Sequence, residues 1–164
     1  MRRKRASLCR TAFLQAPHRA SRLALLQVDL QQYRVIEFAE RGLQGGNWRN
    51  LLSVHINYHM PTDDTTLITN TLYDALKQLI AAEKGSVRLI DIGPQGYVVD
   101  YQLPQVSAPD GTLQAAERAF QRVLVTPHGC VTVTLTTRDI DLSEAQRNGI
   151  VQELKALTPP TQRA

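Results

Sequence analysis

The chain has 164 residues, of which 43% are hydrophobic and 21% are charged. A chain of this length suits one domain that buries a substantial core. Two cysteines are too few for a disulfide scaffold. No apolar run approaches the length of about 18 residues that a membrane span needs. The composition therefore predicts one folded domain and no transmembrane segment.

The net charge of +4 is distributed unevenly. Seven of the 19 basic residues fall within residues 1–28, which contain no acidic residue, whereas the rest of the chain holds 12 basic and 15 acidic residues. The basic character belongs to an N-terminal arm, and we expect the folded body to bind no nucleic acid.

Several interpretations of residues 1–28 stay open. The arm is a solvated tail, a targeting segment, an extension from a misplaced start codon, or a segment that contacts nucleic acid or an anionic surface by charge. The compartment depends on the answer. A retained or mis-assigned arm predicts a cytoplasmic protein, and a targeting segment predicts an organellar or envelope protein.

Regular patterns begin after the arm. Residues 33–39 and 51–59 predict strands, the second with apolar and polar side chains in strict alternation. Residues 63–84 predict a helix with one apolar stripe. Thr62, Asp63 and Asp64 are its N-cap candidates, and Gly85 suits the left-handed position after its end.

Two hairpins and a helix are predicted in the second half of the chain. The hairpin strands are residues 86–92 with 96–103, and residues 118–126 with 130–137. A loop over residues 104–112 separates the hairpins, since it contains two prolines and an Asp-Gly pair. Residues 142–157 predict the last helix, with Asp141 and Glu144 as a capping-box-like start.

The element order is therefore β-β-α-β-β-β-β-α. Hairpins connect most of the strands, which predicts an α+β fold with a mostly antiparallel sheet of about six strands covered by two helices. We expect the flexible arm at 1–28, a single α+β domain at 29–158 and a flexible tail at 159–164.

These patterns resemble the PsbP/DcrB-like superfamily of small antiparallel α/β/α sandwiches over about residues 53–157. The resemblance is carried by Met60-Pro61 at a strand end, the helical stretch 72–76, the glycine turn 93–96, the strands 98–101 and 131–136, and the helical stretch 150–154. Members of that superfamily are mostly not enzymes, and they include envelope lipoproteins, photosystem-associated lumenal proteins and chaperones of secreted effectors. The resemblance implies an accessory or chaperone-like protein. The N-terminus departs from the lipoprotein members, because it lacks an apolar signal before Cys9.

A partner-binding surface is predicted on the strand 130–137. Thr132, Thr134 and Thr136 alternate with apolar residues, so they share one face of a sheet that is half-buried or covered by polar structure. Trp48 follows a glycine-rich stretch and is either an anchor for a partner or a plug at the sheet edge. We expect this face, or an exposed sheet edge, to receive a segment of a partner protein.

No catalytic constellation stands out. His55 and His59 lie on one predicted strand, about 13 Å apart at the usual rise, so one zinc ion cannot bridge them. A scattered metal site made of His55, His128 and Cys130 is the alternative, and it would make the protein a metal-dependent enzyme. We favour a non-enzymatic protein that recognises a protein partner and needs no cofactor.

Overall fold

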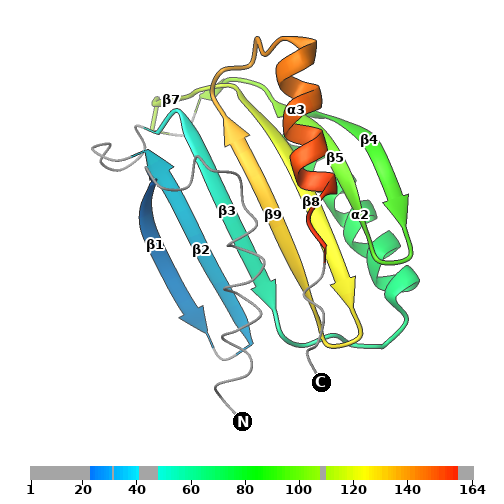
Figure 1. The fold of residues 1–164 in the computed structure, drawn as a ribbon. Helices are drawn as coiled ribbons and strands as arrows, with labels where there is room; N and C mark the ends of the chain where they lie inside the picture. Colours follow the sequence, from blue (N-terminus) through cyan, green and yellow to red (C-terminus); the bar gives the residue numbers. More distant parts are fainter. Residues whose placement is uncertain (1–22, 31, 41–47, 108–109, 159–164) are drawn as a thin grey trace.

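The computed structural model of the chain describes residues 23–30, 32–40, 48–107 and 110–158. Within these residues the strands form a seven-stranded antiparallel sheet in the order β1-β2-β3-β9-β8-β5-β4 (Figure 1). Its strands in chain order are β1 (Leu23–Leu30), β2 (Tyr33–Glu40), β3 (Asn50–Asn57), β4 (Ser86–Gly93), β5 (Gly96–Leu103), β8 (Glu117–Thr126) and β9 (Gly129–Thr137).

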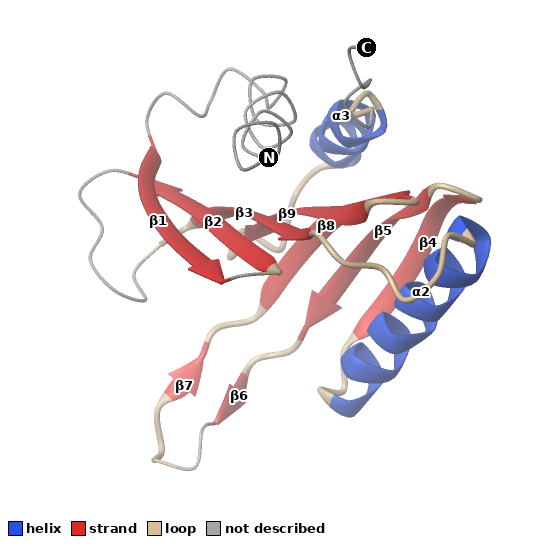
Figure 2. Ribbon diagram, turned by 90° about the horizontal axis from the view of Figure 1, so that it is seen from below, coloured by secondary structure: helices blue, strands red, loops and turns tan. Residues whose placement is uncertain are grey.

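The two helices of the described chain lie on opposite faces of the sheet (Figure 2). Helix α2 (Thr65–Ala82) packs against β4, β5 and β8, and its Ile68 joins Tyr97 and Val123 in one core cluster. Helix α3 (Glu144–Lys155) packs against β8 and β5, and its Leu154 joins Phe120 in a second cluster. The expected α+β fold, with two helices covering an antiparallel sheet, is confirmed. We call the two faces the α2 side and the α3 side.

The sheet has one strand more than the six expected. Strand β1 pairs with β2 along its whole length, and the boundary that we expected at residue 28 falls inside it. The arm was delimited by the absence of acidic residues before Asp29, whereas the apolar-rich stretch of β1 already begins at Leu23. Residues 1–22 and 159–164 lie outside the described residues.

A small hairpin begins inside the expected loop at residues 104–112 and ends just after it. Strand β6 (Val106–Ser107) pairs with β7 (Leu113–Gln114) and forms a separate two-stranded sheet. This β6–β7 hairpin projects from the α2 side of the main sheet (Figure 2). Its prolines and Asp-Gly pair indicated a turn, but each strand has only two residues and therefore too little alternation to be recognised.

Helix α2 ends differently from the expectation. The left-handed residue is Lys84, with φ at 58°, and not Gly85. The amide of Lys84 donates to the carbonyl of Ala81 and that of Gly85 to the carbonyl of Ile80, which is the Schellman pattern. Gly85 is required for another reason: a Cβ there would lie 2.4 Å from the carbonyl oxygen of Gln102. At the other end Asp64 is the N-cap, and its side chain accepts from the Leu67 amide at 3.0 Å.

The substitution Lys84→Gly should raise the free energy of unfolding by about 1 kcal/mol, because glycine adopts positive φ without a Cβ clash. Chemical denaturation of the purified protein measures this. The neighbouring substitution Gly85→Ala is the matched control and should be destabilising. If Lys84→Gly instead lowers the free energy of unfolding, the Lys84 side chain contributes more to stability than its left-handed backbone conformation costs.

Helix α3 begins with a capping box made of Ser143 and Gln146, and not of Asp141 and Glu144. The Ser143 hydroxyl accepts from the Gln146 amide at 3.3 Å, and the Gln146 side chain accepts from the Ser143 amide at 2.8 Å. Both pairs have the spacing of the motif. The expectation was wrong by two residues, since a serine hydroxyl accepts the bond from the N3 amide as well as an aspartate carboxylate does.

A buried ion pair joins β5 to β8 on the α3 side. Asp100, only 3% exposed, accepts from Arg118 Nε at 2.9 Å and from its Nη2 at 2.5 Å. Arg88 on β4 donates to the same carboxylate at 3.2 Å, but its side chain is 64% exposed. The two guanidinium groups thus differ in solvation while sharing one acceptor.

The substitution Asp100→Ala should lower the free energy of unfolding by about 3–5 kcal/mol, because it leaves the Arg118 charge buried without its partner. Arg88→Ala should change it by no more than about 1 kcal/mol, since that partner is solvated. Thermal and urea denaturation compare the two. Equal losses in both variants would contradict the role assigned to burial.

Candidate functional site

The α2 side of the sheet is only partly covered by a helix. Helix α2 lies against β4, β5 and β8, at one end of the strand order, and Figure 2 shows no helix of the described chain beneath β1, β2 and β3. We call the α2-side surface of β2, β3 and β9 the open face. Its residues are Val35, Glu37, Leu51, Ser53, His55, Thr132, Thr134 and Thr136.

The three predicted threonines lie together on the open face. Thr132 is opposite His55 and Thr136 is opposite Leu51, and both threonines are half-buried. Thr134 is buried, with 8% of its surface exposed. Thr132 and Thr136 are therefore accessible from solvent, whereas Thr134 belongs to the packed interior of the face.

A row of polar side chains crosses the sheet through Thr134. Tyr97 Oη donates to Gln121 Oε1 at 3.2 Å, and Gln121 Nε2 donates to Thr134 Oγ1 at 3.2 Å. Farther along the row, Ser53 Oγ donates to Glu37 Oε1 at 3.5 Å. The hydrogen bonds run from beneath α2 to the open face and satisfy polar groups that are costly to bury alone. The sequence did not indicate this row, because its members come from five strands.

Tyr33 and His55 form a second polar pair on neighbouring strands. Tyr33 Oη is hydrogen-bonded to His55 Nδ1, and the two rings meet edge to face with centroids 5.7 Å apart. Burial raises the pKa of Tyr33, with smaller contributions from Cys130 and Glu37, so the phenol keeps its proton and donates. Burial lowers the pKa of His55, although Glu37 acts in the opposite direction. The neutral imidazole then carries its proton on Nε2.

His55 should make the protein less stable in mild acid. Because its folded pKa lies below the unfolded value of about 6.5, the unfolded chain binds more protons, and stability falls as the pH drops through that window. Urea denaturation at pH 7 and pH 5 should show a smaller loss for His55→Gln than for the wild type. Because the other titrating groups are the same in both proteins, their contributions cancel when the two losses of unfolding free energy are subtracted. An equal loss in both would contradict the assignment.

Two of the three residues of the predicted metal site, His55 and Cys130, lie on adjacent strands, and the third, His128, does not lie on a strand. Cys130 faces Asn57 and His55 faces Thr132, so the two side chains occupy diagonal positions on adjacent strands. His128 is exposed in the turn between β8 and β9. Burial raises the pKa of the Cys130 thiol, although a backbone hydrogen bond from Asn57 opposes it. In the described ranges no three His, Cys, Asp or Glu residues form a group that could hold a metal ion.

Trp48 lies at the end of the sheet where β3 begins and β9 ends. The guanidinium group of Arg138 stacks on its indole ring at 4.1 Å, and Arg138 Nη1 donates to its carbonyl oxygen at 3.1 Å. The Arg138 amide also bonds to the carbonyl of Arg49, which extends the pairing of β9 with β3 by one residue. The indole is therefore half-buried under a cation at one end of the strands.

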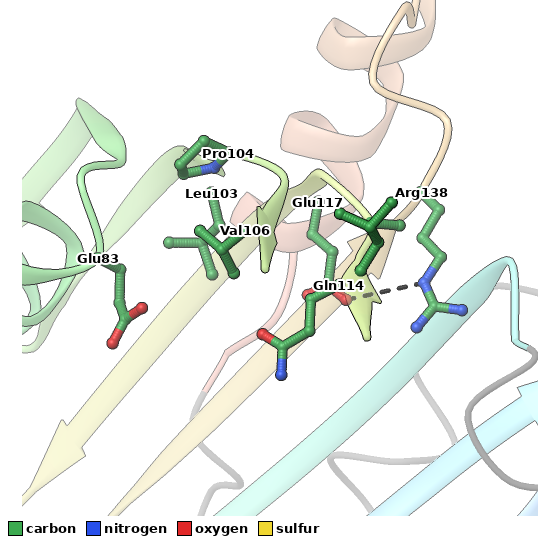
Figure 3. A pocket seen from close by; sticks show the side chains of 9 residues that line it. Glu83, Leu103, Pro104, Val106, Gln114, Glu117 and Arg138 are labelled. Atoms are coloured by element: carbon green, nitrogen blue, oxygen red, sulfur yellow. Dashed lines mark ion pairs between the residues drawn. The ribbon is translucent and has the colours of Figure 1, made fainter. Parts of the chain in front are cut away.

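A pocket of about 460 Å³ opens beside Arg138 (Figure 3). We call it the hairpin pocket, because the β6–β7 hairpin forms one of its walls. Its main lining residues are Glu83, Leu103, Val106, Leu113, Glu117 and Arg138. Sequence reasoning missed it, since its walls come from the end of α2, the ends of β5 and β9, the start of β8 and a hairpin that was expected to be a loop.

Glu117 and Arg138 form the charged end of the hairpin pocket. Arg138 Nε lies 3.7 Å from Glu117 Oε1, and both side chains are about three-tenths exposed. Burial raises the pKa of Glu117, and the guanidinium group of Arg138 partly offsets this. The two groups form a loose ion pair, since 3.7 Å exceeds hydrogen-bond length.

Comparison of the chain with models of known protein families finds no match, and neither does a search of curated proteins. Neither helix in the described part of the chain combines the length and the apolar character needed to cross a membrane. The open face and the hairpin pocket are the two surfaces of the described chain whose geometry bears on function.

Proposed function

We propose that this protein is a non-enzymatic accessory protein, chaperone-like in action, that holds a segment of a partner protein on the open face. One observation carries the proposal: the sheet is covered on both sides at β5 and β8, whereas β2, β3 and β9 keep a half-exposed polar surface on the α2 side. An antiparallel sheet can leave such a face to solvent, and an extended segment laid along this one would bury it further.

The chemistry of the open face suits a polypeptide segment. Thr132 and Thr136 each supply a hydroxyl that donates and accepts, and neutral His55 supplies an Nε2 donor. Val35 and Leu51 add half-buried apolar surface between these groups. A peptide presents the same mixture of main-chain polar groups and apolar side chains, so the two surfaces are complementary.

The face is a better docking position than the edge at β4. Strand β4 has a bulge between Leu89 and Asp91, and it carries Arg88 and Asp91 as charged side chains. Bulges and charges of this kind discourage the addition of a further strand. We therefore place the partner segment on the open face.

A photo-crosslinking amino acid at Thr132 or Thr136, introduced in cells that make the protein, should capture one recurrent partner peptide, which mass spectrometry of the adducts identifies. The matched control is the same amino acid at Gln78, which is exposed on α2. With the crosslinking amino acid at Thr136, the substitution Thr132→Arg should abolish the adduct. With the crosslinking amino acid at Thr132, Thr136→Arg should do the same. Gln78→Arg should leave both adducts intact.

The proposal fails if the adducts from Thr132 and Gln78 are indistinguishable, or if neither open-face position gives an adduct while the variants remain folded by circular dichroism. A metal analysis of the same purified protein also tests the alternative enzyme hypothesis. Near-stoichiometric zinc that is lost in His55→Ala would support that alternative.

A further inference from the structure

The hairpin pocket carries excess negative charge. Two carboxylates, those of Glu83 and Glu117, line it together with a single cation, Arg138. Arg138 is already engaged by the Trp48 ring, the Trp48 carbonyl oxygen and Glu117. The carboxylate of Glu83, by contrast, makes no hydrogen bond or ion pair within the described part of the chain. The charge that is free to attract a ligand is therefore negative.

The remaining walls of the pocket are aliphatic. Leu103 and Pro104 come from the end of β5, Val106 from β6, and Leu113 from β7. Leu113 is 67% exposed, which is unusual for a large apolar side chain and leaves it available for contact. Figure 3 shows Glu83 and Glu117 on opposite sides of Leu103 and Val106. The volume of about 460 Å³ lies within the range of about 300–1,000 Å³ that is usual for ligand pockets.

We propose that the hairpin pocket binds a long aliphatic side chain that ends in a cation, namely a lysine or arginine of the partner segment. The aliphatic stem lies along Leu103, Val106 and Leu113, the charged end reaches the free carboxylate of Glu83, and Glu117 adds to the negative charge of the pocket. Long basic side chains regularly bury their methylene stems in this way while the charge stays near solvent.

This inference rests on the proposed function and adds the partner's chemistry to it. The pocket and the open face lie on the same side of the sheet, because Glu117 follows the alternation that places Ala119 and Gln121 on the α2 side. Arg138 directly follows the end of β9 and comes two residues after Thr136. A segment that lies on the open face can therefore place a basic residue in the pocket.

The test uses n-hexylammonium as the probe and the full chain labelled with ¹⁵N. We expect saturable shifts of the Gln114 and Ala115 amides in the NMR spectrum, with weaker shifts from hexanol and from hexanoate. Affinity should fall about two- to fivefold in Glu83→Gln and in Glu117→Gln, as for a carboxylate–ammonium pair at a partly exposed site. Glu153→Gln, on exposed α3 surface, is the matched control and should bind as the wild type does.

Three outcomes overturn the inference. The first is equal binding of hexanol and hexylammonium, which would show that charge plays no role. The second is stronger binding of hexanoate, which would make Arg138 the determinant. The third is the absence of saturable shifts with any probe. Because Glu83 is exposed, its variant keeps the test valid even if Glu117→Gln proves unstable. Crosslinks from Thr132 would survive all three, so failure here is distinguishable from failure of the proposed function.

Discussion

The central constraint on this fold is that both helices pack against the same part of the sheet. Strands β5 and β8 have helices on both faces, and accordingly Val98, Val99, Phe120, Val123 and Val125 have at most 1% of their surfaces exposed. A strand buried on both faces must be apolar at successive positions, and β-branched residues suit that environment. Strands β2 and β3 have no such requirement on the α2 side. Their polar residues are therefore compatible with folding, and the open face is a direct consequence of where α2 lies.

The polar groups inside the sheet fix its register. A slip of one residue along β8 would carry Gln121 into the apolar α3 side and would move Phe120 beneath α2. It would also separate Arg118 from Asp100, which leaves the buried Arg118 charge without its partner and Asp100 with only the exposed Arg88. The same polar row that reaches the open face thus holds the strands in the alignment that creates that face. Thr134 belongs to this framework, since its hydroxyl already accepts from Gln121.

Local patterns predicted the elements well, and non-local arrangements poorly. The alternation over residues 130–137 was sufficient to place Thr132, Thr134 and Thr136 on one face, because side chains along a strand alternate regardless of what the strand pairs with. The pairing of β3 with β9 joins segments about 80 residues apart, and nothing in either segment indicates its partner. The Tyr33–His55 bond and the hairpin pocket depend on the pairing of strands, so sequence reasoning found the row of threonines and missed these two features. Lys84 shows the opposite case, in which tertiary contact at Gly85 overrides a local preference.

In the proposed function, the open face and the hairpin pocket make different kinds of contribution to the recognition of a partner segment. Threonine hydroxyls donate and accept equally well, so Thr132 and Thr136 can satisfy the polar groups of many segments and discriminate little among them. The pocket has a fixed shape and one sign of available charge, and it therefore rejects an acidic side chain by repulsion as well as favouring a basic one. Specificity then depends on a few residues around Glu83 and Glu117, whereas affinity is spread along the sheet. A protein that must hold a segment and later release it benefits from this separation, since neutralising one carboxylate weakens the most selective contact while the sheet itself stays intact.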